Sequence, residues 1–143
     1  MAPRRRAPRG GSILGSDAAE RSHSSTAGGW LMTVLTLLDQ LRAAVERLAA
    51  PAAIQVQFLK EFGTYPSADE LGLLFHDLAV AASHLRSQNV ISEQALASIR
   101  GLDEKITDFS GDSYSDEWDA SALEKSRNWA DVREMASKTL KEL

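Results

Sequence analysis

The sequence contains no cysteine and no long apolar run. Without cysteine the chain can form no disulfide, no thiolate nucleophile and no thiolate zinc site. No stretch approaches the roughly 18 apolar residues that a membrane-spanning helix needs. The apolar segment WLMTVLTLL lies too far from the first basic residues to act in a signal peptide. We therefore expect a cytoplasmic protein that does not enter a membrane.

The motifs of several enzyme classes are also missing. The chain has no G-x-S-x-G nucleophile elbow, no Walker phosphate-binding loop and no G-x-G-x-x-G dinucleotide fingerprint. The glycine-containing segment RGGSILGSD follows no predicted strand, so it is not a phosphate-binding turn. From the motifs we assign no catalytic residue, no cofactor and no bound metal.

The net charge of -4 hides an uneven distribution along the chain. Residues 1–31 carry five arginines against Asp17 and Glu20, a net charge of +3. The remaining 112 residues carry 11 Lys and Arg against 18 Asp and Glu, a net charge of -7. An acidic body repels nucleic-acid phosphates and attracts basic partners, more weakly as salt rises. We predict that it binds a basic protein and no nucleic acid.

Residues 1–29 are dominated by Arg, Ser, Gly, Ala and Pro, and only Ile13 and Leu14 are large aliphatics. This composition predicts a disordered tail. Its arginine cluster either has no specific partner or contacts a nucleic acid or an anionic membrane. Met32 lies where composition changes abruptly, so it is also an alternative start of translation.

Apolar residues repeat every three or four positions from Leu31 onward, which is typical of helices that bury one face. No alternating run rich in β-branched residues predicts a strand. Helices are predicted at 31–48, 51–62, 68–87 and 93–108, with a short one at 119–126 and a last one capped by Asn128. The fold class is therefore all-α, a bundle-like single domain of five to six helices at 30–143.

Two predicted helices begin with a capping box, in which a serine and a glutamate three residues later satisfy each other's backbone N–H groups. The first box is Ser67 with Glu70, and the second is Ser121 with Glu124. The helix at 68–87 is apolar around most of its circumference, which predicts a position at the centre of the bundle.

An acidic segment at 103–119 holds seven carboxylates against Lys105 alone. A calcium loop starting at Asp108 would place Ser113 where glycine is required and Asp119 where a bidentate glutamate is needed. The segment is otherwise a capped connection or a docking surface for a basic protein. The candidate partner-binding residues are Asp108, Asp112, Tyr114, Asp116, Glu117, Trp118 and Asp119. Trp118 has a second interpretation, which is core packing against the last helix.

The pair His76 and Asp77 resembles the metal-binding pair of metal-dependent phosphohydrolases, but the preceding histidine of that motif is missing. Asp77 and His84 share a helix face that is otherwise apolar, so a candidate pocket contains Asp77, His84 and His76. This defines an alternative function, a metal-dependent hydrolase using His76 and Asp77. The simpler interpretation of His76 is a partly exposed helix residue.

The apolar stripe from Leu31 to Leu48 has near-heptad spacing. Such a stripe either packs into the core or forms the seam of a dimer. A structural homodimer through the first helix is therefore a further alternative.

The segments YPSADELGLLFHDL and NWADVREMASKTLKEL resemble a group of small α-helical proteins of unknown function from high-GC Gram-positive bacteria, over about residues 32–143. The resemblance implies a helical fold and no particular chemistry. Some acidic helical proteins of this size are immunity proteins that neutralise basic toxin domains. By that analogy, the leading prediction is a non-catalytic protein-binding module, either inhibitor-like or a scaffold, with an acidic docking surface.

Overall fold

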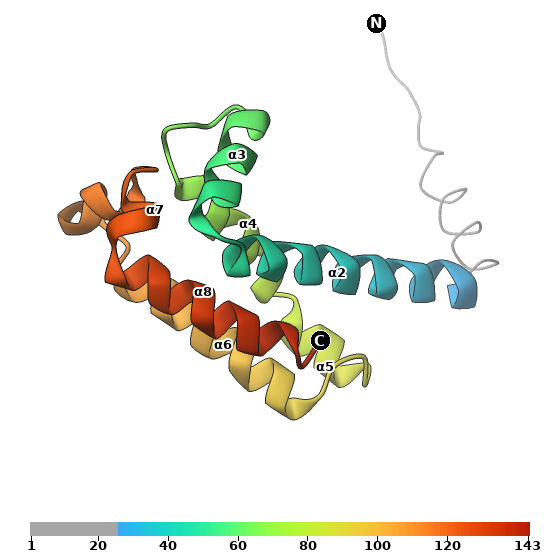
Figure 1. Cartoon of the computed structure of the whole chain (residues 1–143). Coiled ribbons are helices and arrows are strands. Elements are labelled where there is room, and N and C mark those ends of the chain that lie inside the picture. Colours follow the sequence, from blue (N-terminus) through green and yellow to red (C-terminus); the bar gives the residue numbers. More distant parts are fainter. Residues whose placement is uncertain (1–25) are drawn as a thin grey trace, which may run out of the picture. The chain divides into compact units, whose positions relative to one another are not determined.

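The computed structural model describes the backbone of residues 26–143 and the side chains from Thr33 onward. The all-α prediction is confirmed, because this part of the chain contains seven α-helices, one 3₁₀ helix and no strand. The elements are α2 (Thr26–Ala49), α3 (Ala52–Phe62), α4 (Asp69–Ala79), α5 (Ala82–Ser87), α6 (Glu93–Asp108), η2 (Asp112–Trp118), α7 (Ala122–Lys125) and α8 (Arg127–Leu140) (Figure 1).

The described part of the chain divides into two units within α2: the first ends at Thr36, and the second comprises residues 37–143. Most of the predicted disordered tail, including its arginine cluster, lies outside the described residues. Helix α2 begins at Thr26. No helix in the described range is both long and apolar enough to cross a membrane.

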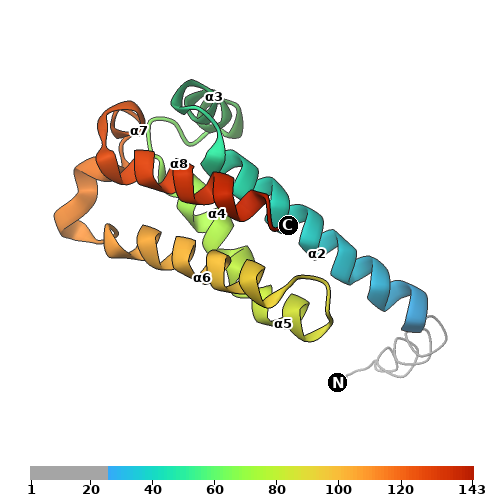
Figure 2. The ribbon, with the colours of Figure 1, turned by 60° about the horizontal axis from the view of Figure 1, so that its bottom comes forward.

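Helices α6 and α8 pack side by side in the second unit (Figure 2). Each buries one apolar stripe against its neighbours. The buried residues are Ala95, Leu96, Ile99, Leu102 and Ile106 of α6, and Trp129, Val132, Ala136 and Thr139 of α8. Helix α6 has the predicted bounds because Ser92 caps it, its Oγ accepting a hydrogen bond from the Ala95 N–H at 3.0 Å.

The predicted central helix at 68–87 is wrong in two respects. It is divided into α4 and α5, because the Ala81 N–H bonds to the Leu78 carbonyl three residues back, at 3.0 Å, and the chain turns there. This turn brings α5 against α6 and buries Leu85. Helix α4 is not surrounded by others either, since Leu73 is 53% exposed and Val80, just beyond its end, is 71% exposed.

The predicted helix starts also need correction. The capping box at Ser67 does not form, because Ala68 occupies the N-cap position and the Ser67 Oγ accepts from the N–H two residues later at 3.1 Å. Ser121 makes no side-chain hydrogen bond to the start of α7. Helix α8 is capped by Ser126 instead of Asn128.

The apolar stripe of the first predicted helix is used within the chain. Leu41, Val45 and Leu48 of α2 are fully buried. These positions therefore contribute to the core of residues 37–143 and offer no surface to a second copy.

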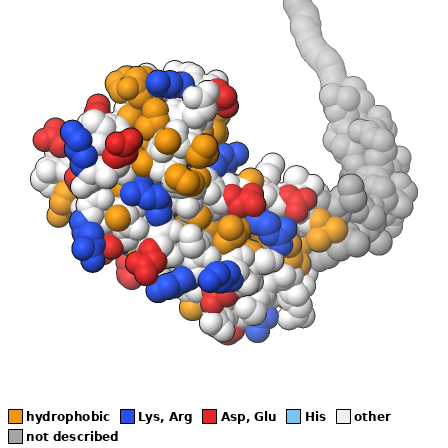
Figure 3. Space-filling model, viewed as in Figure 1, with side chains coloured by type: hydrophobic (Ala, Val, Ile, Leu, Met, Phe, Trp, Pro, Cys, Tyr) orange, Lys and Arg blue, Asp and Glu red, His pale blue; other side chains and the backbone are white. Residues whose placement is uncertain are grey.

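The surface of the second unit is mixed in character. Hydrophobic side chains gather over α3, where Ile54 and Phe62 are at least half exposed, whereas α8 carries interleaved charges (Figure 3). Two of these charges form the ion pairs Arg127–Asp131 and Lys138–Glu134 with acidic residues of the same helix. Helix α8 therefore presents no uniformly basic face to a nucleic acid.

Candidate functional site

A groove of about 670 Å³ lies between α4, α6 and η2. Its size is within the range of ligand-binding pockets in proteins. It is lined by Ser67, Asp69, Gly72, Leu73, His76, Asp103, Ile106, Thr107, Ser110, Gly111, Asp112, Ser115 and Trp118. All of these residues belong to the second unit. The groove is a concave feature against which the predicted site residues can be compared.

Trp118 forms part of the groove wall and part of the core. Its indole N–H donates to the Phe109 carbonyl at 2.9 Å, and its ring stacks on Phe109 with centroids 5.3 Å apart. Trp129 of α8 contacts the same ring edge-on at 5.1 Å. The structure thus places Trp118 mainly in the core, and only the remaining exposed part of its ring is available to a ligand.

Gly72 allows Trp118 to lie against α4. A Cβ added at Gly72 would be 2.8 Å from Cη2 of Trp118, closer than side chains approach one another. An isolated glycine inside an apolar helical pattern often marks such a close approach. Gly72 is therefore the sequence feature that could have revealed this side of the groove.

His76 and Asp103 meet at the groove. The Nδ1 atom of His76, on α4, lies 2.9 Å from Oδ1 of Asp103, on α6. This hydrogen bond and the negative charge of Asp103 raise the pKa of His76, with a smaller contribution from Asp77 and against a small desolvation effect. The His76 side chain is 53% exposed and can exchange protons with water.

The predicted candidate pocket is not the one observed. Asp77 and His84 are exposed and do not line the groove, so they do not converge with His76. The hydrogen-bonded partner of His76 is instead Asp103, 27 residues away in the sequence. Across the described residues, no three His, Asp or Glu side chains are placed to hold a metal ion.

The polar atoms lining the groove are largely acceptors. Asp69, Asp103 and Asp112 contribute carboxylates, and no Lys or Arg lines the groove. The hydroxyls of Thr107 and Ser110 donate their hydrogens to backbone carbonyls of α6, which leaves their oxygens free to accept. The groove can therefore hold a group that carries hydrogen-bond donors and positive charge.

The predicted partner-binding residues fall into two sets. Asp108, Asp112, Tyr114 and Asp116 are exposed at the mouth of the groove or beside it along the chain. In the described part of the chain, none of the ion pairs involves these three aspartates. Their charges are thus available to a partner.

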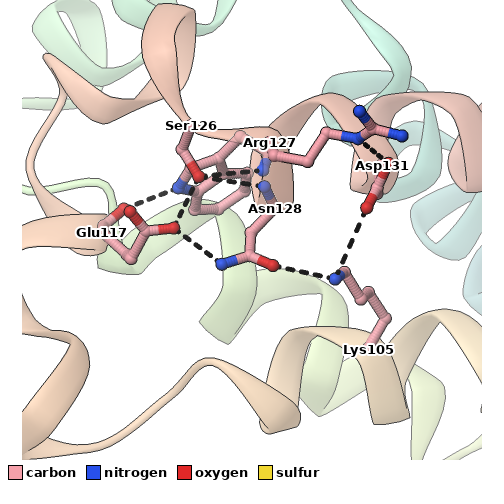
Figure 4. Close-up of polar contacts among 7 residues, drawn as sticks. Lys105, Glu117, Ser126, Arg127, Asn128 and Asp131 are labelled. Atoms are coloured by element: carbon pink, nitrogen blue, oxygen red, sulfur yellow. Dashed lines mark hydrogen bonds and ion pairs between the residues drawn. The ribbon is translucent and has the colours of Figure 1, made fainter.

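Glu117 belongs to the second set, whose members form hydrogen bonds within the fold. Figure 4 shows the polar contacts of Glu117. Its carboxylate accepts from the Ser126 hydroxyl at 2.5 Å and the Asn128 amide at 2.8 Å, and both hydrogen bonds lower its pKa. Its backbone carbonyl accepts from the indole of Trp129 at 2.6 Å. Glu117 therefore anchors the start of α8.

Asp119 and Lys105 are also engaged within the fold. Asp119 accepts from the hydroxyl and the N–H of Ser121, at 2.6 and 2.9 Å, and these bonds lower its pKa. Lys105, the cation of the acidic segment, donates to Asn128 at 2.9 Å and lies 3.7 Å from Asp131. It is directed toward α8, and its charge is not part of the groove lining.

The chain matches no protein-family model, no curated protein and no solved structure. The resemblance over residues 32–143 therefore receives no support from these comparisons.

Proposed function

We propose that this protein is a non-catalytic binding module that docks a basic segment of another protein in the groove between α4, α6 and η2. The observation that carries the proposal is the groove lining, in which three carboxylates and no Lys or Arg surround a concave surface. The exposed Asp108 and Asp116 extend the negative charge along the neighbouring chain. Such a surface raises the encounter rate with a positively charged partner.

The apolar part of the groove lining can bury apolar side chains of the partner, which charge attraction alone does not do. Leu73, Ile106 and Trp118 line the groove together with the carboxylates. A segment that alternates Arg or Lys with apolar side chains satisfies both kinds of lining. In the cell, such docking would cover a basic surface of the partner, as an inhibitor does, or hold it in place, as a scaffold does.

A labelled peptide tests this function directly. We expect a fluorescein-labelled peptide with four repeats of Arg-Leu-Gly to bind, and the same peptide with Glu in place of Arg not to bind. The double variant Asp69→Lys/Asp112→Lys reverses two groove charges and should weaken binding at least roughly tenfold, equivalent to about 1.4 kcal/mol. Fluorescence polarisation measures each affinity.

A matched control separates the groove from the overall charge of the protein. Glu46→Lys/Glu124→Lys makes the same change in net charge at two exposed residues outside the groove lining. Glu124 also lies in the first turn of a helix, as Asp69 does. Equal loss of binding in both double variants, or no binding of the Arg peptide by the wild type, would overturn the proposal.

A further inference from the structure

We infer that the groove binds an arginine side chain of the partner and that this guanidinium competes with the proton on His76 for the charge of Asp103. The inference rests on the proposed function and specifies the ligand group and its regulation. Because of this competition, the partner would bind strongly when His76 is neutral and more weakly when His76 is protonated.

The position of the His76 proton follows from the geometry. Nδ1 of His76 lies 2.9 Å from a carboxylate oxygen of Asp103, so Nδ1 carries a hydrogen and donates it. The proton that titrates is therefore the one on Nε2. When it binds, an imidazolium stands beside Asp103 and adds a positive charge to the groove.

The second carboxylate oxygen of Asp103 is the point of competition. The hydrogen bond to His76 uses Oδ1, and no other side-chain bond to Asp103 exists in the described residues. A guanidinium bound at Oδ2 would be stabilised by the same negative charge that stabilises the imidazolium, and the two cations would repel each other. Each of them therefore lowers the affinity for the other.

The lining favours arginine over lysine. Acceptor oxygens come from different elements, including Asp69 of α4, Thr107 of α6 and Asp112 of η2. A guanidinium has five donors in one plane and no acceptor, so it can bond to several of these oxygens at once, whereas an ammonium is a compact charge. Its flat face also stacks on aromatic rings, and Trp118 lines the groove.

The other charged side chains that line the groove are carboxylates. Asp103 of α6 and the adjacent Asp77 of α4 act electrostatically on His76, and Asp69 and Asp112 line the same groove. The two cations of α6 near this region are engaged elsewhere, Arg100 with the Ser83 hydroxyl and Lys105 with Asn128. His76 is therefore the basic side chain that lines the groove.

Nuclear magnetic resonance with a capped Ala-Arg-Ala tripeptide tests the inference. At about 10 mM, ten times a millimolar Kd, we expect the peptide to shift the Trp118 indole resonance and to lower the pKa of His76. A decrease of one pH unit would correspond to about tenfold weaker binding to the protonated form. Capped Ala-Lys-Ala should bind several-fold more weakly.

His84 provides the matched control, because it is exposed on α5 and lies outside the groove lining. In the His84→Gln variant, the Arg tripeptide should still bind more weakly at pH 5.5 than at pH 8. In His76→Gln, the affinity should become nearly constant over this range. A pH dependence that survives His76→Gln would overturn the inference.

The two proposals fail in different ways. If the longer Arg-Leu-Gly peptide binds through the groove but the tripeptide leaves the pKa of His76 unchanged, only the competition is wrong. Equal affinity for the Arg and Lys tripeptides would overturn the arginine assignment. If neither the long peptide nor the tripeptide shifts any groove resonance, both proposals are wrong.

Discussion

At the level of single residues, Trp118 connects the core to the groove because a glycine lies opposite it. Gly72→Ala would place a Cβ 2.8 Å from the Trp118 ring, which Phe109 and Trp129 hold from the other sides. We expect this variant to lose about 1–3 kcal/mol of unfolding free energy, as overpacked cores do. Urea denaturation measures the loss.

Gly101 is the matched control for this variant. It lies inside α6, and an added Cβ there meets nothing within 4 Å. Gly101→Ala should therefore stabilise the protein by about 0.5–1 kcal/mol, because alanine loses less entropy than glycine in a helix. If both substitutions change the unfolding free energy in the same direction, Trp118 does not pack on Gly72 as described.

The carboxylate of Glu117 stabilises the fold, although the sequence suggests a surface charge. Its pKa is lowered by the hydrogen bonds from Ser126 and Asn128, so its stabilisation is present above its ordinary pKa of 4.5 and is lost as pH falls below it. Glu117→Gln should cost about 1–3 kcal/mol at pH 7. The difference from the wild type should shrink toward pH 3, as measured by urea denaturation.

Asp116 tests whether this effect is specific. It is exposed beside Glu117 and forms no ion pair in the described residues. Asp116→Asn should change stability by less than about 0.5 kcal/mol at any pH. A similar loss in both variants would show that net charge, and not the contacts of Glu117, causes the effect.

The sequence could identify the acidic residues but not their roles. Asp112 and Glu117 belong to one acidic run, yet the first lines the groove and the second bonds to Ser126. The difference depends on which way each side chain points from η2, a 3₁₀ helix interrupted at Tyr114. Local sequence does not determine that direction, because the packing of α8 against the segment does.

At the level of helices, the prediction of α6 succeeded because its signals are local. Helix α6 has its predicted bounds because its N-cap residue, Ser92, and its apolar stripe are both recognisable from residues that are close in the sequence. The break between α4 and α5 was missed because no proline or glycine marks it, and Val80 and Ala81 fit a continuous helix. Packing of α5 against α6 overrides that local preference.

Helix α8 depends on one serine that has two roles. The Ser126 Oγ accepts from the N–H groups of Asn128 and Trp129, at 3.0 and 3.4 Å, and also donates to Glu117. We expect Ser126→Ala to cost about 2 kcal/mol, at the upper end for a cap. Thermal and urea unfolding would both record the loss.

The cap of α6 is the comparison. Ser92 accepts one hydrogen bond, from the Ala95 N–H, and has no carboxylate partner. Ser92→Ala should therefore cost about 1 kcal/mol. A larger loss for Ser92→Ala than for Ser126→Ala would argue against the network around Glu117.

At the level of the whole molecule, the excess of acidic residues over 32–143 was readable from the sequence, whereas the groove was not. His76 and Asp103 are 27 residues apart and meet only because α4 packs on α6. No spacing rule predicts that contact. The total charge is the basis for proposing a cationic partner, and the groove is the basis for proposing where that partner docks.

A long-range field of this kind predicts a specific salt dependence. Between about 0.01 and 0.15 M salt the Debye length falls from about 30 to 8 Å. We expect the association rate of the Arg-Leu-Gly peptide to fall roughly tenfold over this range, while its dissociation rate changes much less. Stopped-flow polarisation separates the two rates.

The two double variants then distinguish the field of the whole molecule from the charge of the groove. Both change the net charge equally, so both should flatten the salt dependence of association to a similar degree. Only Asp69→Lys/Asp112→Lys should also increase the dissociation rate, because only these residues line the groove. If the dissociation rate rises equally in Glu46→Lys/Glu124→Lys, the peptide is held by diffuse charge and not by the groove.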